Sequence, residues 1–431
     1  MVRAVQKTFS SILASSLTTI AGFLAMCTMR LTLGRDIGIV MAKGVLLGVV
    51  STVTILPALI LTFRRSIARH THRTFIPKLR RTSRFVVRRY IPILAVFVFC
   101  FIPFSVAQAK TPVYYTLFDS LPQDLAGIQG TSRLKEDFGM TTSHFIIVDD
   151  GLPARDMEAL TDETEQVDGI RQVLSYEKFL GGGVPREVLP TEVRQIFCAG
   201  GHEMLLANSS YESGTEAQNA QLDALNAIVK RYDPNGVITG EGAMTKDLIE
   251  VADVDFRSVS IASIAAVFLI IAISFRSASI PVLLVAAIES AIMINMGIPY
   301  FTGTTLPFVA SIVIGTIQLG ATVDYAILMT TRFREELNAG RSTKDAVQTA
   351  VEQCSQSILT SGLTFFAATF SVSLASRMEL ISSLCRLISR GALISMLVIL
   401  LVLPALLILT APLIRKTTYH WLSKEKETKT V

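Results

Sequence analysis

The segment Leu306–Thr331 reads LPFVASIVIGTIQLGATVDYAILMTT and contains one acidic or basic side chain, Asp324. It is longer than the roughly 20 apolar residues that cross a bilayer as a helix. Asp324 lies eight residues before Arg332, which places its carboxylate about 12 Å from that end of the helix. A charge at this depth costs about 2.5–3.5 kcal/mol on insertion scales, so chains that keep one commonly use it for ions or protons. The segment predicts a membrane helix with a functional carboxylate.

The composition favours the same class of protein. Hydrophobic residues make up 50% and charged residues 17% of the 431 residues, whereas soluble domains are roughly 25% charged. No small-residue cleavage site and soluble domain follow the first apolar window, so it is not a signal peptide. We expect a multi-pass α-helical membrane protein with eight spans, near Ile12–Met29, Val40–Phe63, Tyr90–Ala109, Val259–Phe275, Ile280–Ile298, Leu306–Thr331, Ile358–Ala375 and Gly391–Leu413.

The distribution of charge predicts the orientation of the spans. Arg64–Arg89 holds ten Lys and Arg and no acid, whereas Lys110–Asp255 holds 25 of the 35 acids against 11 Lys and Arg. Because basic segments stay in the cytoplasm, Arg64–Arg89 is expected inside, beside anionic membrane lipids, and the acidic region outside. One segment runs against this rule: Arg377–Arg390 falls outside and carries three Arg.

These patterns divide the chain into six parts. We expect the last two helices of a first membrane half at 1–63, a basic cytoplasmic linker at 64–89, the first helix of a second half at 90–109, an extracytoplasmic α+β domain at 110–256, the remaining five helices at 257–414 and a cytoplasmic tail at 415–431. Within the α+β domain, two strand–helix–strand patterns follow in tandem, separated by a glycine linker at 181–183. The first comprises a strand at His144–Val148, a helix at Arg155–Val167 and a strand at Gln172–Leu174. The second comprises a strand at His202–Leu206, a helix at Thr215–Lys230 and a strand at Val237–Thr239.

The sequence contains no recognisable catalytic or cofactor motif. His202-Glu203 lacks the second His of a zinc-protease helix, and no phosphate-binding Gly-x-x-x-x-Gly-Lys-Ser/Thr loop occurs. Asp253 and Asp255 precede a membrane helix and are expected to mark its outer end. We therefore predict no enzyme, no metal, no cofactor and no nucleic-acid partner.

An internal repeat organises the membrane part. Ser11–Ala21 returns 346 residues later as Ser357–Ala367, with seven of eleven residues identical. Lys43-Gly44 then pairs with Arg390-Gly391, and Leu56-Pro-Ala-Leu59 with Leu403-Pro-Ala-Leu406. Both copies enter the membrane from the same side, which indicates a parallel repeat. Only ten residues precede the first copy. We expect the C-terminal portion of a protein of about twelve spans, completed by an N-terminal half or by homo-oligomerisation; the alternative is a complete eight-span protein.

Three features together resemble a known family. They are the Gly-x-x-x-Asp-Tyr motif Gly320–Tyr325, the paired Leu-Pro-Ala-Leu endings, and an outer domain after the first helix of the half. The chain is similar over nearly its whole length to the resistance-nodulation-division (RND) superfamily of exporters, in its MMPL branch. The resemblance implies that Asp-Tyr helices of two halves face each other and carry protons inward while lipids, drugs or other hydrophobic or amphiphilic molecules leave the inner membrane. A sterol-sensing-like receptor or a scaffold subunit without transport activity is the competing interpretation.

The candidate site centres on the Asp-Tyr motif. Asp324 and Tyr325 are predicted to relay protons, and Ser357, Ser361 and Thr364 lie on one helical face as candidate partners, because hydroxyls can donate to a carboxylate without adding charge. Their repeat counterparts are Ser11, Ser15 and Thr18. The alternatives are a structural hydrogen bond for Asp324, interfacial packing for Tyr325, and a small-residue packing seam for the serines.

Three further residues complete the candidate site. Gly315 and Gly320 are expected to allow close helix packing. Glu289 is a second buried acid in its own span. It either titrates, helps to bind substrate, or serves a partly hydrated or structural role.

Overall fold

A computed structural model of the chain describes residues 2–70, 79–115, 121, 122, 124–176, 178 and 195–419. Part of the basic linker, the glycine linker 181–183 and the end of the tail lie outside these residues. The chain forms two compact units. Met1–Val113 and Val254–Val431 form the membrane unit, and Tyr114–Asp253 form the sheet unit.

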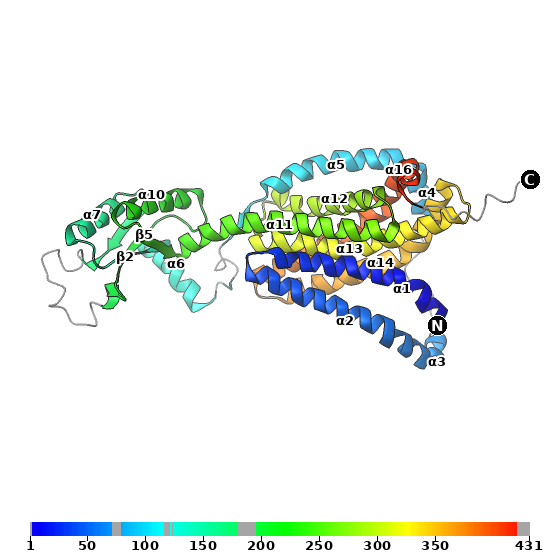
Figure 1. Ribbon diagram of the computed structural model, residues 1–431, viewed down its shortest axis with the longest axis horizontal. Coiled ribbons are helices and arrows are strands. Elements are labelled where there is room, and N and C mark those ends of the chain that lie inside the picture. The colour runs from blue at the N-terminus through cyan, green and yellow to red at the C-terminus, as the bar shows by residue number, and fades with distance from the viewer. Residues whose placement is uncertain are drawn as a thin grey trace, which may run out of the picture. The chain divides into compact units, whose positions relative to one another are not determined.

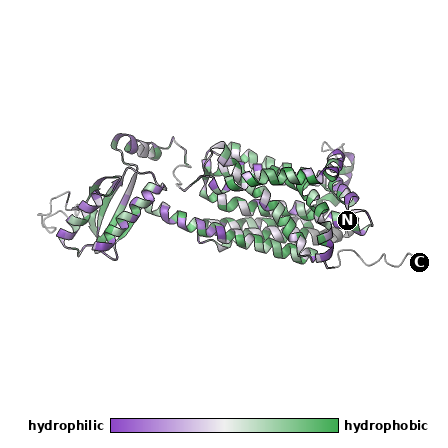
Figure 2. Ribbon diagram, turned by 90° about the horizontal axis from the view of Figure 1, so that it is seen from above, coloured by the Kyte–Doolittle hydropathy of each residue, from purple (hydrophilic) through white to green (hydrophobic). Residues whose placement is uncertain are grey.

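The membrane unit consists of helices, most of them long and apolar (Figures 1 and 2). Among the described residues, seven helices are long and apolar enough to cross a membrane, and Ser15–Thr28 is a shorter apolar helix. The chain is therefore a multi-pass helical membrane protein, as the sequence predicts, while the count of eight spans stays a prediction. The long helices are α1 Val2–Ala25, α2 Thr32–Thr62, α5 Tyr90–Lys110, α11 Glu241–Phe275, α12 Ser279–Thr302, α13 Phe308–Asn338, α14 Thr343–Ala375, and α15 Glu379–Leu397, which continues through the π-helical turn η4 Val398–Val402 into α16 Leu403–Thr417.

Short elements complete this unit. The 3-10 turn η1 Met26–Thr28 joins α1 to α2, and α3 Arg64–Arg69 and α4 Arg80–Arg88 lie in the basic linker. The short strand β1 Val113–Tyr114 follows α5, and β7 Leu306–Pro307 precedes α13. The backbone N–H of Leu306 donates to the carbonyl of Pro112 at 3.0 Å.

Helix α13 forms the centre of the bundle. It packs against α1, α12, α14 and α15, and most of its side chains are buried, including Phe333, which is completely enclosed. Helix α2 differs sharply, because its long apolar surface, including Leu46, Leu47 and Ile55, is exposed. The Asp-Tyr motif therefore lies on the most enclosed helix of the bundle, at the side where α1 packs.

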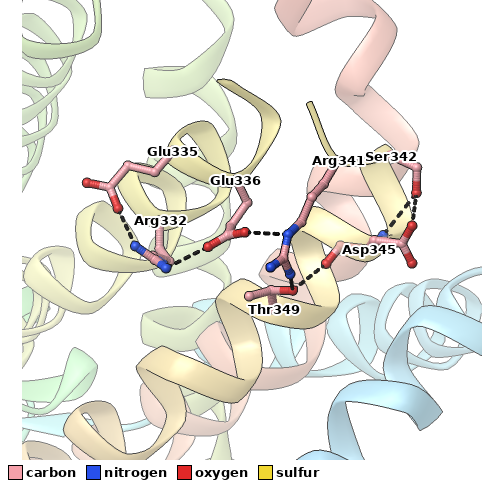
Figure 3. A network of polar contacts seen from close by, with 7 residues as sticks. All are labelled: Arg332, Glu335, Glu336, Arg341, Ser342, Asp345 and Thr349. Carbon is pink, nitrogen blue, oxygen red and sulfur yellow. Dashed lines mark hydrogen bonds and ion pairs between the residues drawn. The ribbon is translucent and has the colours of Figure 1, made fainter. Parts of the chain in front are cut away.

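Ion pairs fix the turn between α13 and α14 (Figure 3). The Glu336 side chain is only 6% exposed and binds two guanidinium groups, Arg332 Nη2 at 2.6 Å and Arg341 Nε at 2.9 Å. Ser342 caps α14 by accepting a hydrogen bond from the backbone N–H of Asp345 at 3.3 Å. This network restrains the two helices that carry the Asp-Tyr motif and Ser361.

The sheet unit contains one antiparallel sheet in the order β3-β5-β2-β6, with β4 paired to β5. Helices α7 and α10 pack on one face, over a core that includes Ile146, Val148 and Leu205. The two strand–helix–strand patterns are not separate in tandem, because β2 of the first lies between β5 and β6 of the second. The elements are α6 Ala126–Phe138, β2 Thr142–Asp149, α7 Ala154–Glu165, β3 Ile170–Leu174, β4 Cys198–Ala199, β5 His202–Ser209, α10 Glu216–Tyr232 and β6 Val237–Gly240.

One histidine is enclosed in this core. His144 on β2 is fully buried, with Nε2 3.2 Å from Oε1 of Gln221. Its Nδ1 has no hydrogen-bond partner among the described residues. Burial lowers the pKa of His144 below its ordinary value of 6.5, and the contact with Gln221 opposes this shift only in part. The fold therefore favours the neutral imidazole over the protonated form.

We expect the sheet unit to lose stability as the pH falls below about 6.5. The pKa of His144 is lower in the folded than in the unfolded state, so the unfolded chain binds the proton first as the pH falls. The contribution of His144 to stability is therefore complete above the unfolded pKa. It is lost as the pH falls from the unfolded pKa towards the folded pKa. Hydrogen exchange of the β2 and α10 amides, corrected for intrinsic rates, measures this loss. His144→Gln should weaken the pH dependence, whereas His202→Gln at an exposed site should keep it. Equal pH dependence in both variants contradicts the assignment.

Candidate functional site

Helix α1 crosses α13 closely at the Asp-Tyr motif. Thr19 on α1 donates a hydrogen bond from Oγ1 to the carbonyl oxygen of Gly320 at 2.8 Å. A Cβ built on Gly320 would lie 3.4 Å from the Thr19 methyl carbon, and one built on Gly22 would lie 4.0 Å from the Gly320 Cα. Small residues at this crossing let α1 run close to α13, and the turn of α1 before Thr19 reaches Asp324.

Among the described residues, one hydroxyl group approaches the Asp324 carboxylate at this crossing. The Ser15 side chain lies within hydrogen-bonding reach of the Asp324 carboxylate. Oδ1 of Asp324 is buried and has no hydrogen-bond partner among the described residues, and no Lys, Arg or His nitrogen of those residues forms an ion pair with it. A carboxylate in this environment can accept a proton without breaking a salt bridge.

Tyr325 meets the equivalent residue of the other repeat copy. Its hydroxyl lies 3.2 Å from Oγ of Ser361 on α14, and either oxygen can donate. Ser15 and Ser361 are separated by the 346-residue repeat offset. The two adjacent residues of the motif therefore contact equivalent serines of the two repeat copies. Asp324 contacts Ser15 of α1, and Tyr325 contacts Ser361 of α14.

Among the described residues, Ser357, Thr364 and Thr18 make no hydrogen bond to the motif. Ser357 and Thr364 are exposed, and Thr364 donates a hydrogen bond to the carbonyl of Thr360 on its own helix at 2.7 Å. Thr18 likewise bonds within its own helix, to the carbonyl of Ser15, and the side chain of Ser11 lies outside the described residues. The sequence analysis names Ser357, Ser361 and Thr364 as relay residues and gives Ser15 only as a repeat counterpart, so the repeat contained the signal for Ser15.

Two further candidates, Gly315 and Glu289, show no contact with the Asp-Tyr motif among the described residues. A Cβ on Gly315 would meet no atom of the described residues within 4 Å, so its role as a packing glycine stays a prediction. Glu289 is half-buried on α12. In the described part of the chain, no hydrogen bond or ion pair joins it to the Asp-Tyr motif.

A polar network that the sequence did not reveal includes Gln318, which lies six residues before Asp324 on α13. Asn295 Nδ2 donates to Gln318 Oε1 at 2.9 Å, and Gln318 Nε2 donates to Ser395 Oγ at 2.9 Å. Arg390 donates from Nε to Oδ1 and from Nη2 to the carbonyl of Asn295, both at 2.8 Å. A Cβ on Gly391 would lie 2.4 Å from Gln318 Oε1, so the network depends on a glycine there. The network joins α12, α13 and α15.

Asp255 holds the α1–α2 pair in place. Its carboxylate, only 1% exposed, accepts backbone N–H bonds from Arg30 at 2.9 Å and Leu31 at 3.0 Å. These two residues form the turn before α2. Asp255 on α11 thus does more than mark a helix end, because it fixes the hairpin whose first helix brings Ser15 to Asp324.

We expect Asp255→Ala to destabilise the membrane unit, because it removes two hydrogen bonds to a charged group, each worth about 1.5–3 kcal/mol. Thermal unfolding and hydrogen exchange of the Arg30 and Leu31 amides test this loss. Asp253→Ala is the matched control, since Asp253 is exposed two residues earlier on the same helix. Equal stability of the two variants contradicts the anchoring role.

Comparison with known proteins gives a consistent assignment. The sequence profile of the MMPL family matches residues 1–93 and 122–428. The chain is 26% identical over 206 residues to the membrane protein ActII-3 of Streptomyces coelicolor, covering 46% of this chain and 29% of that protein. It is 24% identical over 162 residues to the mycolic acid-containing lipids exporter MmpL11 of Mycolicibacterium smegmatis, covering 37% and 16%.

A third relative is the siderophore exporter MmpL5 of Mycobacterium tuberculosis, which is 24% identical over 168 residues, covering 37% of this chain and 17% of that protein. The matched segments therefore span less than one third of each of these three relatives. Because the family profile matches most of the sequence, from the first helix to the tail, the chain belongs to the MMPL family of the RND superfamily.

Proposed function

We propose that this chain forms the proton-binding part of a proton-driven exporter of hydrophobic or amphiphilic molecules such as lipids. The observation that carries the proposal is the Asp324 carboxylate, which lies on the central helix with one hydroxyl in reach and an unbonded Oδ1. The names of MmpL11 and MmpL5 as lipid and siderophore exporters support the substrate class. Transport, and no enzymatic reaction, is the proposed activity.

The contacts of Asp324 suggest how a proton could change the helix arrangement. An ionised carboxylate only accepts hydrogen bonds, from Ser15 on α1, whereas a protonated carboxyl also donates one. The two states therefore favour different positions of α1 relative to α13. Each inward proton yields about 2.3 kcal/mol per 100 mV of membrane potential, which is available to drive such a movement.

The proposal includes an orientation and a partner. The basic linker is placed in the cytoplasm and the acidic sheet unit outside the cell membrane, following the distribution of Lys and Arg. A further set of helices, from an N-terminal half or another copy of the chain, would cover the exposed side of α2 and face the motif. The apolar side chains exposed on α2 and the unbonded Oδ1 of Asp324 support this partner.

A flux assay tests the proposed function. The intact protein with its completing helices, reconstituted in vesicles, should export a fluorescent lipid when a proton gradient is imposed, and a protonophore should abolish the export. The matched control is the same vesicle preparation without protein. Flux that is insensitive to the protonophore contradicts proton coupling. Partner binding without any flux favours the receptor or scaffold interpretation.

A further inference from the structure

Three arginines occupy the end of the membrane unit where the chain runs into the sheet unit. We call this the junction end; α5 ends there at Lys110, and Thr111 bonds to the carbonyl of Met296 on α12 at 3.0 Å. Arg377 precedes α15, while Arg386 and Arg390 lie one turn apart on it and therefore share one side of the helix. These are the arginines that run against the orientation rule, so their presence requires a separate explanation.

Among the described residues, no acid balances the positive charge of Arg390. Within that part of the chain, its guanidinium bonds only to the side-chain oxygen and the carbonyl of Asn295. Among the described residues, no carboxylate lies within ion-pair distance of Arg386 or Arg390, and the acid on the same helix, Glu379, is seven residues before Arg386. A partly buried cation without a counter-charge is costly, and a bound anion would reduce that cost.

Arg390 lies near the outer edge of the hydrocarbon core, from which a long side chain can reach the lipid headgroups. About 20 apolar residues cross the hydrocarbon core, and counting back from Arg415 along α16 and α15 reaches Ser395. Arg390 lies five residues beyond it, about 7 Å further along the helix. Tyr300 on α12, 44% exposed, and its neighbour Phe301, 58% exposed, lie five and six residues beyond Asn295, as expected for an interfacial aromatic belt.

We propose that Arg386 and Arg390 bind the anionic headgroup of a lipid, through its phosphate or carboxylate, at the junction end. Asn295 occupies Nε and Nη2 of Arg390 and thereby fixes the guanidinium plane, while Nη1 has no partner among the described residues. Arg386 is exposed and forms one long contact, from Nη2 to Ser382 Oγ at 3.4 Å. Two guanidinium groups one helical turn apart suit an oxyanion that accepts several hydrogen bonds.

Native mass spectrometry of the full chain tests this site. We expect the protein purified in a neutral detergent to retain added phosphatidylglycerol and not phosphatidylcholine. Arg386→Gln combined with Arg390→Gln should weaken retention of phosphatidylglycerol by about tenfold or more, because charge-assisted pairs are lost. The single variant Arg386→Gln, at an exposed position, should weaken it in the same direction without affecting folding.

The matched control changes the same charge at the other end of the bundle. Arg415→Gln with Lys416→Gln should leave the retention unchanged, and equal loss in this control overturns the site in favour of non-specific attraction. Retention that survives in both Arg386 variants also overturns it. Competition by inorganic phosphate indicates recognition of the oxyanion alone, whereas its failure indicates that the acyl chains contribute. Binding should persist in Asp324→Asn, so the site is separable from the proposed transport.

Discussion

Asp324→Asn is expected to reduce proton-driven flux to the level of vesicles without protein. Asn has nearly the same shape as Asp and costs less to bury, so expression and thermal stability should stay close to those of the unmodified protein. The variant cannot take up a proton, and it removes the only carboxylate on α13 within the span Leu306–Thr331. Flux of a lipid probe under an imposed proton gradient, with the protein amount measured in the same vesicles, provides the test.

Neighbouring variants separate proton binding from packing. Tyr325→Phe removes one hydroxyl and keeps the ring buried, so it should reduce flux less than Asp324→Asn. Ser15→Ala should alter the pH dependence of flux because Ser15 reaches the carboxylate, whereas Ser357→Ala at an exposed site is the matched control. Full flux in Asp324→Asn ends the relay hypothesis. Equal effects of the two serine variants end the assignment of Ser15.

The class of the protein was predictable because it depends on local composition. An apolar segment of membrane length is evident without knowledge of its neighbours, and a single charge such as Asp324 stands out within it. The Asp-Tyr motif and the repeat were sufficient for the resemblance to the MMPL family, which the family match confirms. These signals lie within single helices or in the order of helices along the chain.

The contacts of the site were not predictable because they depend on which helices are neighbours. The same hydroxyl pattern occurs in both repeat copies, so the sequence did not show that Ser15 from α1 reaches the carboxylate. The partners Asn295, Gln318 and Arg390 are scattered over three helices, and each alone resembles an ordinary polar residue near a span. The order of strands in the sheet also depends on tertiary contacts. Two strand–helix–strand patterns in tandem do not reveal that β2 lies between β5 and β6.

Gly391→Ala is expected to cost about 1–3 kcal/mol of stability through overpacking. The new Cβ would lie 2.4 Å from Gln318 Oε1 and 2.6 Å from Asn295 Nδ2. Side-chain ends usually move away from such a contact, but these two are bonded to each other, and moving them breaks a buried network. Thermal unfolding in detergent measures the loss. Gly315→Ala, where a Cβ meets nothing within 4 Å, should be neutral or slightly stabilising.

Gly44, the repeat counterpart of Gly391, tests whether further helices complete the bundle. A Cβ on Gly44 meets nothing within 4 Å in this chain, so Gly44→Ala should leave the stability of the isolated chain unchanged. Suppose that a first-half bundle packs on α2 around Gly44 in the way that the second half packs around Gly391. In that case Gly44→Ala should impair assembly when the helices of the first half are co-expressed with this chain. Co-purification and unfolding of the assembled form measure this difference. A neutral result in both contexts contradicts the pseudo-symmetric packing, because parallel repeats place Gly44 and Gly391 in equivalent surroundings.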